Sequence, residues 1–515
     1  MRLSRRALLA RAPAAAAAAA LAACALDGRP TVVDVRAFGA RGDGIADDSQ
    51  AIQAAAAALR PEGILRFPRG VYRFAQRWPP GGAAIVLSGT TDVTVEFDPG
   101  AELYMDNLHP TERTGSSHGV LVRGPVSRVT LRDINIRWAD GARRSLGDGI
   151  RVEGMPTAGE DPPSGWPGQD TPVDGVVVSG CTVRSSPQTG VVMLGVSDIE
   201  VTGLRVTDSG ADGLHFNACR NAVVDGFSAV NTGDDGLALV TYFTPQPAFD
   251  APSHTFSFPD LTEWSNTDFR VSNVNVFGCR ANGVRLAGAA GVDIRGLDVV
   301  AVHSGSAFLV DSAEPGTDVG WNYVATRGVR LGDLTATDCD MGIHLLARPG
   351  ASGDARFTDF DVHVDDAKID DCATWAVRAE SLTDRHTTGL RIDTCSVTAS
   401  STTGGNGGLG IATSRAISFG DMSIRHSEPV VVVDAVDAEE LTVDHLSVAI
   451  TRPDPPDSAA KYVVSLEDSS GDIEELTIGW PAAPRSWIPV RRSAALALPN
   501  LTVTPPVATS SVQRP

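Results

Sequence analysis

The sequence predicts an all-β solenoid, and three observations lead to this fold class. Short apolar runs recur along the chain at a spacing near 23 residues. No stretch between these runs has the periodicity of a helix. Glycine is abundant, at 52 of 515 residues, and aromatic residues make up only 6%, a composition that suits short strands joined by turns.

The repeated run begins with any residue and then a small residue, and it continues as an alternating apolar strand. Its copies are "DGIRV" from Asp148, "TGVVM" from Thr189, "DGLHF" from Asp212, "DGLAL" from Asp235, "NGVRL" from Asn282, "SAFLV" from Ser306, "MGIHL" from Met341 and "WAVRA" from Trp375. A second strand precedes most copies. Because one coil cannot bury its own apolar face, stacked coils must form the core. A β-sandwich with accidental spacing is the alternative.

Alternation along each strand predicts which side chains point inward. The inward set is Leu214, Phe216, Leu237, Leu239, Val284 and Leu286. The residues between them should form an outward column, which reads Arg151, Val192, His215, Ala238, Arg285, Leu309, His344 and Arg378. Several of these are cationic or titratable, so the column is a candidate anion-binding groove. A solvated face is the simpler interpretation.

Long insertions follow the same strand of the coil and should form the wall of one groove. They cover residues 155–170, 242–267, 312–325 and 347–358. Their aromatic residues are Trp166, Tyr242, Phe243, Phe249, Phe256, Phe258, Trp264, Trp321 and Tyr323. Exposed rings beside a groove suit stacking on sugars. We expect most of these rings to pack the loops onto the solenoid instead.

The N-terminal stretch, residues 1–23, is predicted to be an export signal, with a basic start, an Ala/Leu-rich centre and small residues before Cys24. Arg5-Arg6 resembles a twin-arginine signal. "LAAC" resembles a bacterial lipoprotein box, with lipidation at Cys24; an ordinary secretory signal is the alternative. We expect export to the bacterial cell surface or the extracellular medium, with membrane contact only through this lipid.

Charge and cysteine content exclude several classes of partner. A net charge of −20 argues against nucleic acid. Six cysteines follow Cys24: Cys181, Cys219, Cys279, Cys339, Cys372 and Cys395. No CxxC pair is present, so we expect no zinc or other metal site. Export permits disulfides, but lone buried thiols suit a ladder better. We expect a monomer.

One segment carries a specific resemblance to a known fold. "VVDVRAFGARGDGIADDSQAIQAAAAAL", residues 32–59, is similar to the N-terminal signature of pectate-lyase-superfamily right-handed β-helices. The resemblance implies a right-handed parallel β-helix with an N-terminal capping helix near 48–59, for which Ser49 is the expected N-cap. The expected organisation is a signal at 1–23, a linker at 24–30, a cap at 31–75, the β-helix at 76–503 and a disordered tail at 504–515.

A second resemblance concerns activity. "GADGLHF" and "TGDDGLALV" resemble paired motifs of polygalacturonase-type enzymes, glycoside hydrolase family 28, and place Asp212, Asp234 and Asp235 on the catalytic positions. The family's third motif, Gly-His-Gly, is here "ANG", with Asn282 in place of the histidine. The fourth, Arg-Ile-Lys, is here "FLV" from Phe308, and Arg285 or His303 could substitute. The substrate-clamping half of the family's site is therefore altered or lost.

Crowded carboxylates suit glycoside hydrolysis, which needs an acid for the leaving oxygen and a base for water. By the family pattern, Asp235 is the acid, and Asp212 and Asp234 position and deprotonate the water. The predicted substrate-binding residues are His215, Asn282, Arg285, Arg151 and Tyr242. The structural alternative is that these aspartates only satisfy turn amides, as Asp148 and Asp208 are expected to do.

Three functions remain open at this stage. The first is a glycoside hydrolase acting on a polysaccharide, pectin-like or otherwise acidic, without a cofactor. The second is a polysaccharide lyase or uronate epimerase on the same scaffold, for which Ca²⁺ would be the expected ion. The third is a non-catalytic glycan-binding or structural β-helix.

The lipoprotein box gives a direct prediction. Cys24→Ser should release the protein from the membrane fraction without unfolding it, because the lipid is then the only anchor. Cell fractionation followed by circular dichroism of the released protein measures both effects. A wild-type protein that fractionates entirely as soluble would rule out the anchor.

Overall fold

The computed structural model describes residues 30–155, 172–250, 254–454, 462–484, 487–506 and 512–513. The predicted signal, Cys24, most of the linker and tail, and the loop that carries Trp166 lie outside the described residues. The chain divides into two units. Unit 1 runs to Asp234 and includes Pro247–Phe256, and unit 2 contains Asp235–Gln246 and everything from Ser257 onward.

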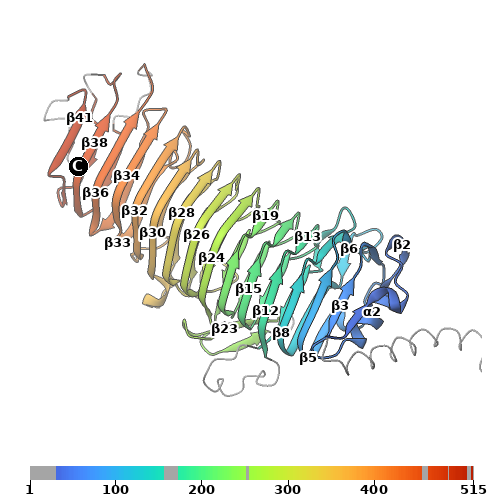
Figure 1. The fold of residues 1–515 in the computed structure, drawn as a ribbon. Coiled ribbons are helices and arrows are strands. Elements are labelled where there is room, and N and C mark those ends of the chain that lie inside the picture. Colours follow the sequence, from blue (N-terminus) through green and yellow to red (C-terminus); the bar gives the residue numbers. More distant parts are fainter. Residues whose placement is uncertain are drawn as a thin grey trace, which may run out of the picture. The chain divides into compact units, whose positions relative to one another are not determined.

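Unit 1 begins with the predicted cap. Its elements are β1 Val32–Asp34, η1 Val35–Phe38, β2 Asp43–Asp47, α2 Ser49–Ala58, β3 Ile64–Phe67, β4 Gly70–Phe74 and η2 Pro80–Gly82. Helix α2 buries Ile52 and Ala55 completely, and it lies beside the first coil in Figure 1. Among the described residues, no helix has the length and hydropathy of a membrane span.

The predicted N-cap of α2 is wrong by one residue. Asp48 occupies the cap position, and Ser49 is the first residue of the helix. The Ser49 hydroxyl instead accepts hydrogen bonds from the backbone N–H groups of Ala75 and Gln76, at 2.9 and 3.0 Å. The serine therefore satisfies the backbone that leaves β4 rather than the start of its own helix.

The rest of unit 1 consists of stacked parallel strands (Figure 1). One ladder contains β5 Ala83–Phe97, β8 His118–Arg132, β12 Val173–Ser179, β15 Val196–Thr202 and β18 Arg220–Asp225. A second contains β6 Ala101–Met105, β9 Asn135–Trp138, β13 Thr182–Arg184, β16 Arg205–Thr207 and β19 Ser228–Val230. The third contains the first part of β8, β11 Ile150–Glu153, β14 Val191–Leu194 and β17 Leu214–Asn217. Outside them lie β7 Thr114–Ser116, β10 Arg143–Leu146 and β22 Ala248–Asp250.

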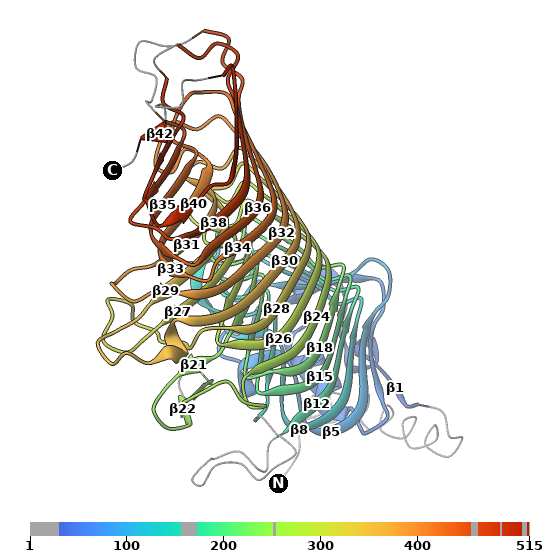
Figure 2. The same ribbon diagram turned by 90° about the vertical axis from the view of Figure 1, so that its left-hand side faces the viewer.

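Unit 2 also consists of stacked parallel strands, which form two long ladders (Figure 2). The first contains β24 Asn266–Phe277, β26 Ala289–Val300, β28 Arg327–Thr337, β30 Asp359–Asp370, β32 Thr388–Ala399, β34 Ser418–His426, β36 Leu441–Ile450, β38 Gly471–Gly479, β40 Leu496–Ala497 and β41 Asn500–Thr504. The second contains β20 Leu237–Val240, β25 Val284–Ala287, β27 Ser306–Ala313, β29 Met341–Arg348, β31 Trp375–Ser381, β33 Gly408–Arg415, β35 Val433–Glu439, β37 Val464–Glu467, β39 Val490–Arg492 and β42 Val512–Gln513.

Insertions in unit 2 follow β20, β27 and β29, which belong to one ladder, as the sequence predicted. They carry the short elements β21 Tyr242–Phe243, β23 Thr255–Phe258 and η3 Ala355–Phe357. Three of their aromatic side chains, those of Phe258, Trp264 and Tyr323, are at most 7% exposed. The expectation that most rings pack the loops onto the solenoid is confirmed for these residues, whereas Trp321 is 57% exposed.

The strand register confirms the predicted side-chain directions within each unit. All six predicted inward residues are fully buried. In unit 1, Arg151 pairs with Val192, and Val192 pairs with His215. In unit 2, the column runs from Ala238 through Arg285, Leu309 and His344 to Arg378.

Steric crowding explains why each repeat has a small residue at its second position. A Cβ atom on Gly190 would lie 2.6 Å from the carbonyl oxygen of Gly213 in the next coil. A Cβ atom on Gly283 would lie 2.5 Å from the carbonyl oxygen of Ala307. Neighbouring coils therefore approach too closely at this corner for most side chains, which explains the repeated "DG", "TG" and "NG" pairs.

The six cysteines within the described residues are all buried in the core of the ladder, as the sequence predicted. Burial raises the pKa of Cys181, Cys219 and Cys395 to about 12. These thiols therefore stay protonated and act as small apolar residues of the ladder.

The inward-facing side chains of unit 2 should contribute strongly to the stability of the fold. Phe308→Ala should lower the free energy of unfolding by about 3–5 kcal/mol, because Phe308 is fully buried between coils. Phe277 is 50% exposed, so Phe277→Ala is the matched control and should change it by less than about 0.5 kcal/mol. Urea unfolding followed by circular dichroism measures both. Equal effects would show that Phe308 does not lie in the core.

Candidate active site

Unit 1 brings together two of the three predicted catalytic acids. Asp212 precedes β17, and Asp234 follows β19 one repeat later. Their carboxylate oxygens lie within 4.8 Å of one another. The side chains are 15% and 35% exposed, so solvent reaches both.

Each of these acids contacts a basic side chain of unit 1. His215 Nδ1 lies 2.8 Å from Asp212 Oδ2, so an ionised Asp212 accepts from the ring N–H and fixes the ring. Arg144 Nη2 donates to Asp234 Oδ2 at 2.9 Å. The sequence predicted His215 near the site, but as a residue that binds substrate.

Asp235 is the next residue along the chain and begins unit 2. It is only 3% exposed. The backbone N–H and the side-chain amide of Asn282 both donate to Asp235 Oδ1, at 3.0 and 2.8 Å. Asn282 Oδ1 in turn accepts from the backbone N–H of Ser306, at 2.9 Å. The asparagine at the family's histidine position thus holds Asp235 and links it to the following coil.

Arg285 lies in a buried charge network above β25. Its guanidinium donates to both carboxylate oxygens of Asp311, at 3.2 and 3.0 Å, and to the hydroxyl of Tyr323, at 2.7 Å. Arg348 donates to the same Asp311, which is fully buried. Burial disfavours the charged guanidinium, but the nearby charges of Asp311 and Asp235 outweigh it and hold the pKa of Arg285 well above its usual value.

His303, the other candidate to replace the missing basic residues, lies elsewhere on unit 2. Its ring is 65% exposed and contacts Asp338, which is also exposed. Arg285 interacts with the charge of Asp235, so the arginine is the better placed of the two.

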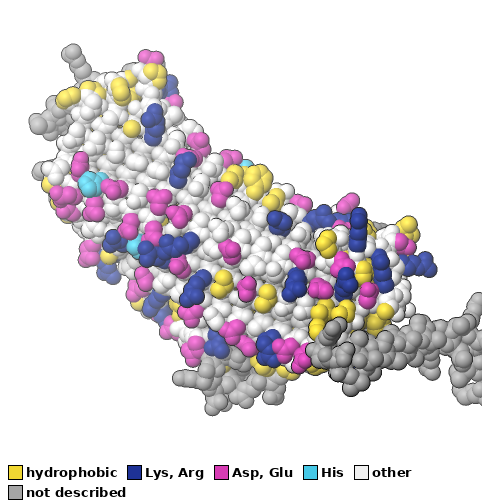
Figure 3. All heavy atoms as spheres, viewed as in Figure 1, with side chains coloured by type: hydrophobic (Ala, Val, Ile, Leu, Met, Phe, Trp, Pro, Cys, Tyr) yellow, Lys and Arg dark blue, Asp and Glu magenta, His cyan; other side chains and the backbone are white. Residues whose placement is uncertain are grey.

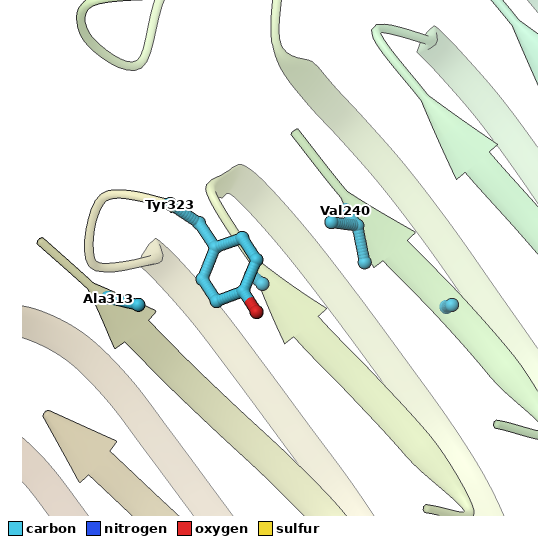
Figure 4. Packing of buried hydrophobic residues seen from close by; sticks show 5 residues of the cluster. Val240, Ala313 and Tyr323 are labelled. Carbon is cyan, nitrogen blue, oxygen red and sulfur yellow. The ribbon is translucent and has the colours of Figure 1, made fainter. Parts of the chain in front are cut away.

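An aromatic cluster covers the outward face beside Arg285. Tyr323 packs on Ala238, Val240, Ala287 and Ala313, with its hydroxyl directed back toward the strands (Figure 4). Tyr242 joins this cluster from the neighbouring insertion. The exposed ring of Trp321 lies against Tyr242, with centroids 4.9 Å apart. The predicted sugar-stacking residue Tyr242 is therefore half-buried, and Trp321 is the ring presented to solvent.

Arg151 belongs to a second buried network, in unit 1. Its guanidinium binds both Asp148 and Glu153. Burial raises the pKa of Glu153, but hydrogen bonds and charges from His254 and Arg151 outweigh it and hold the pKa far below its usual value. The expectation that Asp148 is only a turn residue is incomplete. It accepts from the backbone N–H of Thr189 in the next coil, but it is also 1% exposed and paired with Arg151.

The basic residues of the outward column thus all have acidic partners within their own units. Arg151, His215 and Arg285 are described above, and His344 and Arg378 both contact Glu380, at 3.1 and 2.8 Å. Binding of an anionic glycan by this column stays a prediction, and it requires the glycan to compete with these carboxylates.

Two groups of described side chains have the composition of a cation site. One contains the carboxylates of Asp212 and Asp234, and the other contains His363, Asp365 and Asp393. Arginines already neutralise the second group: Arg330 binds Asp365, and Arg391 binds Asp393. Figure 3 shows basic and acidic side chains gathered side by side on this face of the molecule. In the first group, Arg144 binds Asp234 and His215 binds Asp212.

Sequence analysis missed Arg144 and Asp311. Arg144 lies on the short strand β10, 90 positions before its partner, and no repeat signal marks it. Asp311 had a usable signal, because it stands two residues after Leu309 and shares its outward direction.

The contacts of Glu380 with His344 and Arg378 predict that the stability of the fold depends on pH. Burial raises the pKa of Glu380, but hydrogen bonds from His344 and Arg378 outweigh it and lower the pKa from 4.5 to about 2. A carboxyl group with a lowered pKa stabilises the fold above its unfolded pKa and loses this contribution as the pH falls through its folded pKa. Glu380→Gln should therefore destabilise the protein at pH 6, and the difference from wild type should shrink between pH 4.5 and 2.

Urea midpoints across this range measure the effect. Glu263 is exposed, so Glu263→Gln is the control and should follow wild type at every pH. A difference for Glu380→Gln that does not change with pH would contradict the lowered pKa.

Comparisons with known proteins agree on the fold. Residues 118–314 match a family model described as right handed beta helix region, and residues 32–89 match one described as rhamnogalacturonase A/epimerase, pectate lyase-like. No curated protein matches the chain.

Three solved structures are similar. A family 28 exopolygalacturonase from Yersinia enterocolitica has 14% identity over 81% of this chain and 78% of its own, with a TM-score of 0.50. A family 87 α-1,3-glucanase from Streptomyces thermodiastaticus has 18% identity over 93% and 68%, with a TM-score of 0.47. A mannuronan C-5 epimerase A-module from Azotobacter vinelandii has 14% identity over 92% and 98%, with a TM-score of 0.47. The two family models and the exopolygalacturonase structure confirm the predicted fold: the chain is a right-handed parallel β-helix, with a pectate-lyase-like segment at residues 32–89.

Proposed function

We propose that this protein is a glycoside hydrolase that cleaves a polysaccharide with the acids of its "GADG" and "GDDG" motifs. The observation that carries the proposal is the pair formed by Asp212 and Asp234, whose carboxylate oxygens lie within 4.8 Å. Ionised carboxylates only accept hydrogen bonds, so both can accept from one water molecule. The fold is shared with glycoside hydrolases, which agrees with the proposal.

The basic partners of the pair suit this role. His215 orients Asp212, and Arg144 offsets the charge of Asp234. Both contacts hold the two carboxyl groups in place beside each other. In the proposed reaction this pair removes a proton from the water as its oxygen attacks the anomeric carbon.

Asp235 supplies the other proton. It would protonate the leaving glycosidic oxygen while the bond to the anomeric carbon breaks, so that water adds across the bond and no other reactant is needed. Asn282 positions the carboxyl group through Oδ1. Asp235 is buried, and its charge acts on Arg285.

The test is release of reducing ends from a panel of acidic and neutral polysaccharides. Asp235→Asn should reduce activity by at least ~10²-fold, the usual scale for losing a positioned acid. Asp212→Asn and Asp234→Asn should have similar effects, and the effects should not add because the three acids act as one unit.

Asp208→Asn is the matched control. Asp208 is exposed and accepts from the side chain of Asn231 in the next coil, so its variant should keep full activity. Asp148 is unsuited as a control because it is buried and charge-paired.

The products separate the proposal from its alternatives. A lyase would leave an unsaturated sugar that absorbs in the ultraviolet, and an epimerase would change the sugar composition without cleavage. Binding without turnover on every glycan would favour a non-catalytic protein. Full activity in all three aspartate variants would place the chemistry outside these motifs.

A further inference from the structure

Unit 2 contains a pocket that the proposed reaction does not use. It has a volume of about 330 Å³ and is formed by β31, β35, β37 and the turn before β33. Its chemically distinctive lining residues are Trp375, Asn406, Asp434, Tyr462, Ser465 and Glu467. This volume lies at the lower end of the range of small-ligand pockets, roughly 300–1,000 Å³.

The pocket is well separated from Arg285 and Asp235. Asp434 lies in the same outward column as Arg285, and the register places Leu309, His344, Arg378 and Gly410 between them. Adjacent strands are about 4.8 Å apart, so these five steps correspond to roughly 24 Å. A ligand in this pocket would therefore not contact the proposed catalytic residues, although a long chain along the column could reach both.

One wall of the pocket is built around Trp375. Arg378 lies over the ring, 4.8 Å from its centroid. The turn "GGNGG" packs against the same side chain, and a Cβ atom on Gly405 would lie 2.0 Å from the ring. Glycine at this position therefore lets the backbone approach the indole, and Asn406 in the same turn is fixed by its bond to the carbonyl oxygen of Val431, at 2.8 Å.

The opposite wall is held by Arg491. Its guanidinium pairs with Glu467 and contacts the hydroxyl and the ring of Tyr462. Ser465 is only 3% exposed, and its hydroxyl lies 3.4 Å from Glu467. Asp434 stands directly beside Ser465 in the register. Burial raises the pKa of Asp434 and outweighs the hydrogen bond from Ser465.

These groups match the surface of a sugar ring. Aromatic side chains pack on the apolar faces of a pyranose, and carboxylate, amide and hydroxyl oxygens accept from its hydroxyl groups. The described basic residues at the pocket already have acidic partners, because Arg491 binds Glu467 and Arg378 binds Glu380. Within the described part of the pocket, a uronate would meet the carboxylates of Asp434 and Glu467 and basic residues that already have acidic partners, so the chemistry favours an uncharged sugar.

We propose that this pocket is a second glycan-binding site, which takes a neutral sugar residue of a polysaccharide between Trp375 and Tyr462. The site binds and does not cleave, so it does not depend on the proposed hydrolase activity. Its role is to hold a chain on unit 2 away from the catalytic motifs.

The test is calorimetric titration of the full chain with neutral tetrasaccharides derived from glucans, xylan and galactan, and with tetragalacturonate. The Asp235→Asn variant is used so that turnover does not consume the probe. At least one neutral tetrasaccharide should bind, and Asp434→Ala should weaken it roughly tenfold or more, as expected for lost hydrogen bonds to a charged group. Tyr462→Ala should have a similar effect, and Tyr462→Phe should keep most of the affinity.

Two control substitutions remove an aspartate and an aromatic side chain that lie outside the pocket. Asp444 on β36 and Phe277 on β24 are exposed and do not line the pocket, so Asp444→Ala and Phe277→Ala should bind as the parent does. Circular dichroism checks that each variant is folded, and Asp434→Asn repeats the test with no change in side-chain size.

Unchanged affinity in both Asp434→Ala and Tyr462→Ala would overturn the assignment. So would binding of tetragalacturonate alone, or the absence of binding by every neutral probe at millimolar concentration. None of these outcomes bears on the aspartates of the proposed reaction, which the reducing-end assay tests separately.

Discussion

The close approach of successive coils at the small residue before each strand is the constraint on which the other features depend. At Gly283 the next coil's carbonyl oxygen would lie 2.5 Å from any Cβ atom. The backbone therefore takes one position relative to its neighbour, and the strand that follows begins in a fixed register. Because side chains alternate along a strand, this one contact decides which residues enter the core and which form the outward column.

In the outward column, the stacking of coils brings charged side chains close together, so each charge needs a partner of opposite sign. Side chains from neighbouring coils are brought within about 4.8 Å, close enough that an unpaired charge would be costly beside apolar neighbours such as Leu309. In unit 2, Asp311 meets this requirement by accepting from Arg285 and Arg348, which belong to the strands on either side of it. Glu380 likewise contacts the basic side chains of His344 and Arg378. The column therefore combines fixed geometry with nearly balanced charge, which favours recognition by hydrogen bonds over attraction of an anion.

The sequence carried enough information for the repeat, the inward residues, the outward column and the insertions, because each depends on periodicity. It also placed Asp212 and Asp234 together, since residues at the same point of consecutive repeats must lie side by side. It could not place Arg144, on the short strand β10 outside the repeat, or Tyr462, in the segment before β37, because the period describes neither position. Ser49 shows a local failure: its hydroxyl satisfies the backbone of Ala75 and Gln76, a tertiary demand that competes with the cap.

The glycine corner also has a consequence for how such a chain can change over evolutionary time. Because each coil sets its own alignment afresh, an added or lost residue in the loops after β20, β27 or β29 is absorbed before the next corner and does not shift later strands. The length and composition of each loop can then vary without disturbing the stacked strands. The small residue at the corner cannot vary in this way. New specificities can arise by exchanging loops one at a time, because the coils keep the same spacing whichever loop they carry.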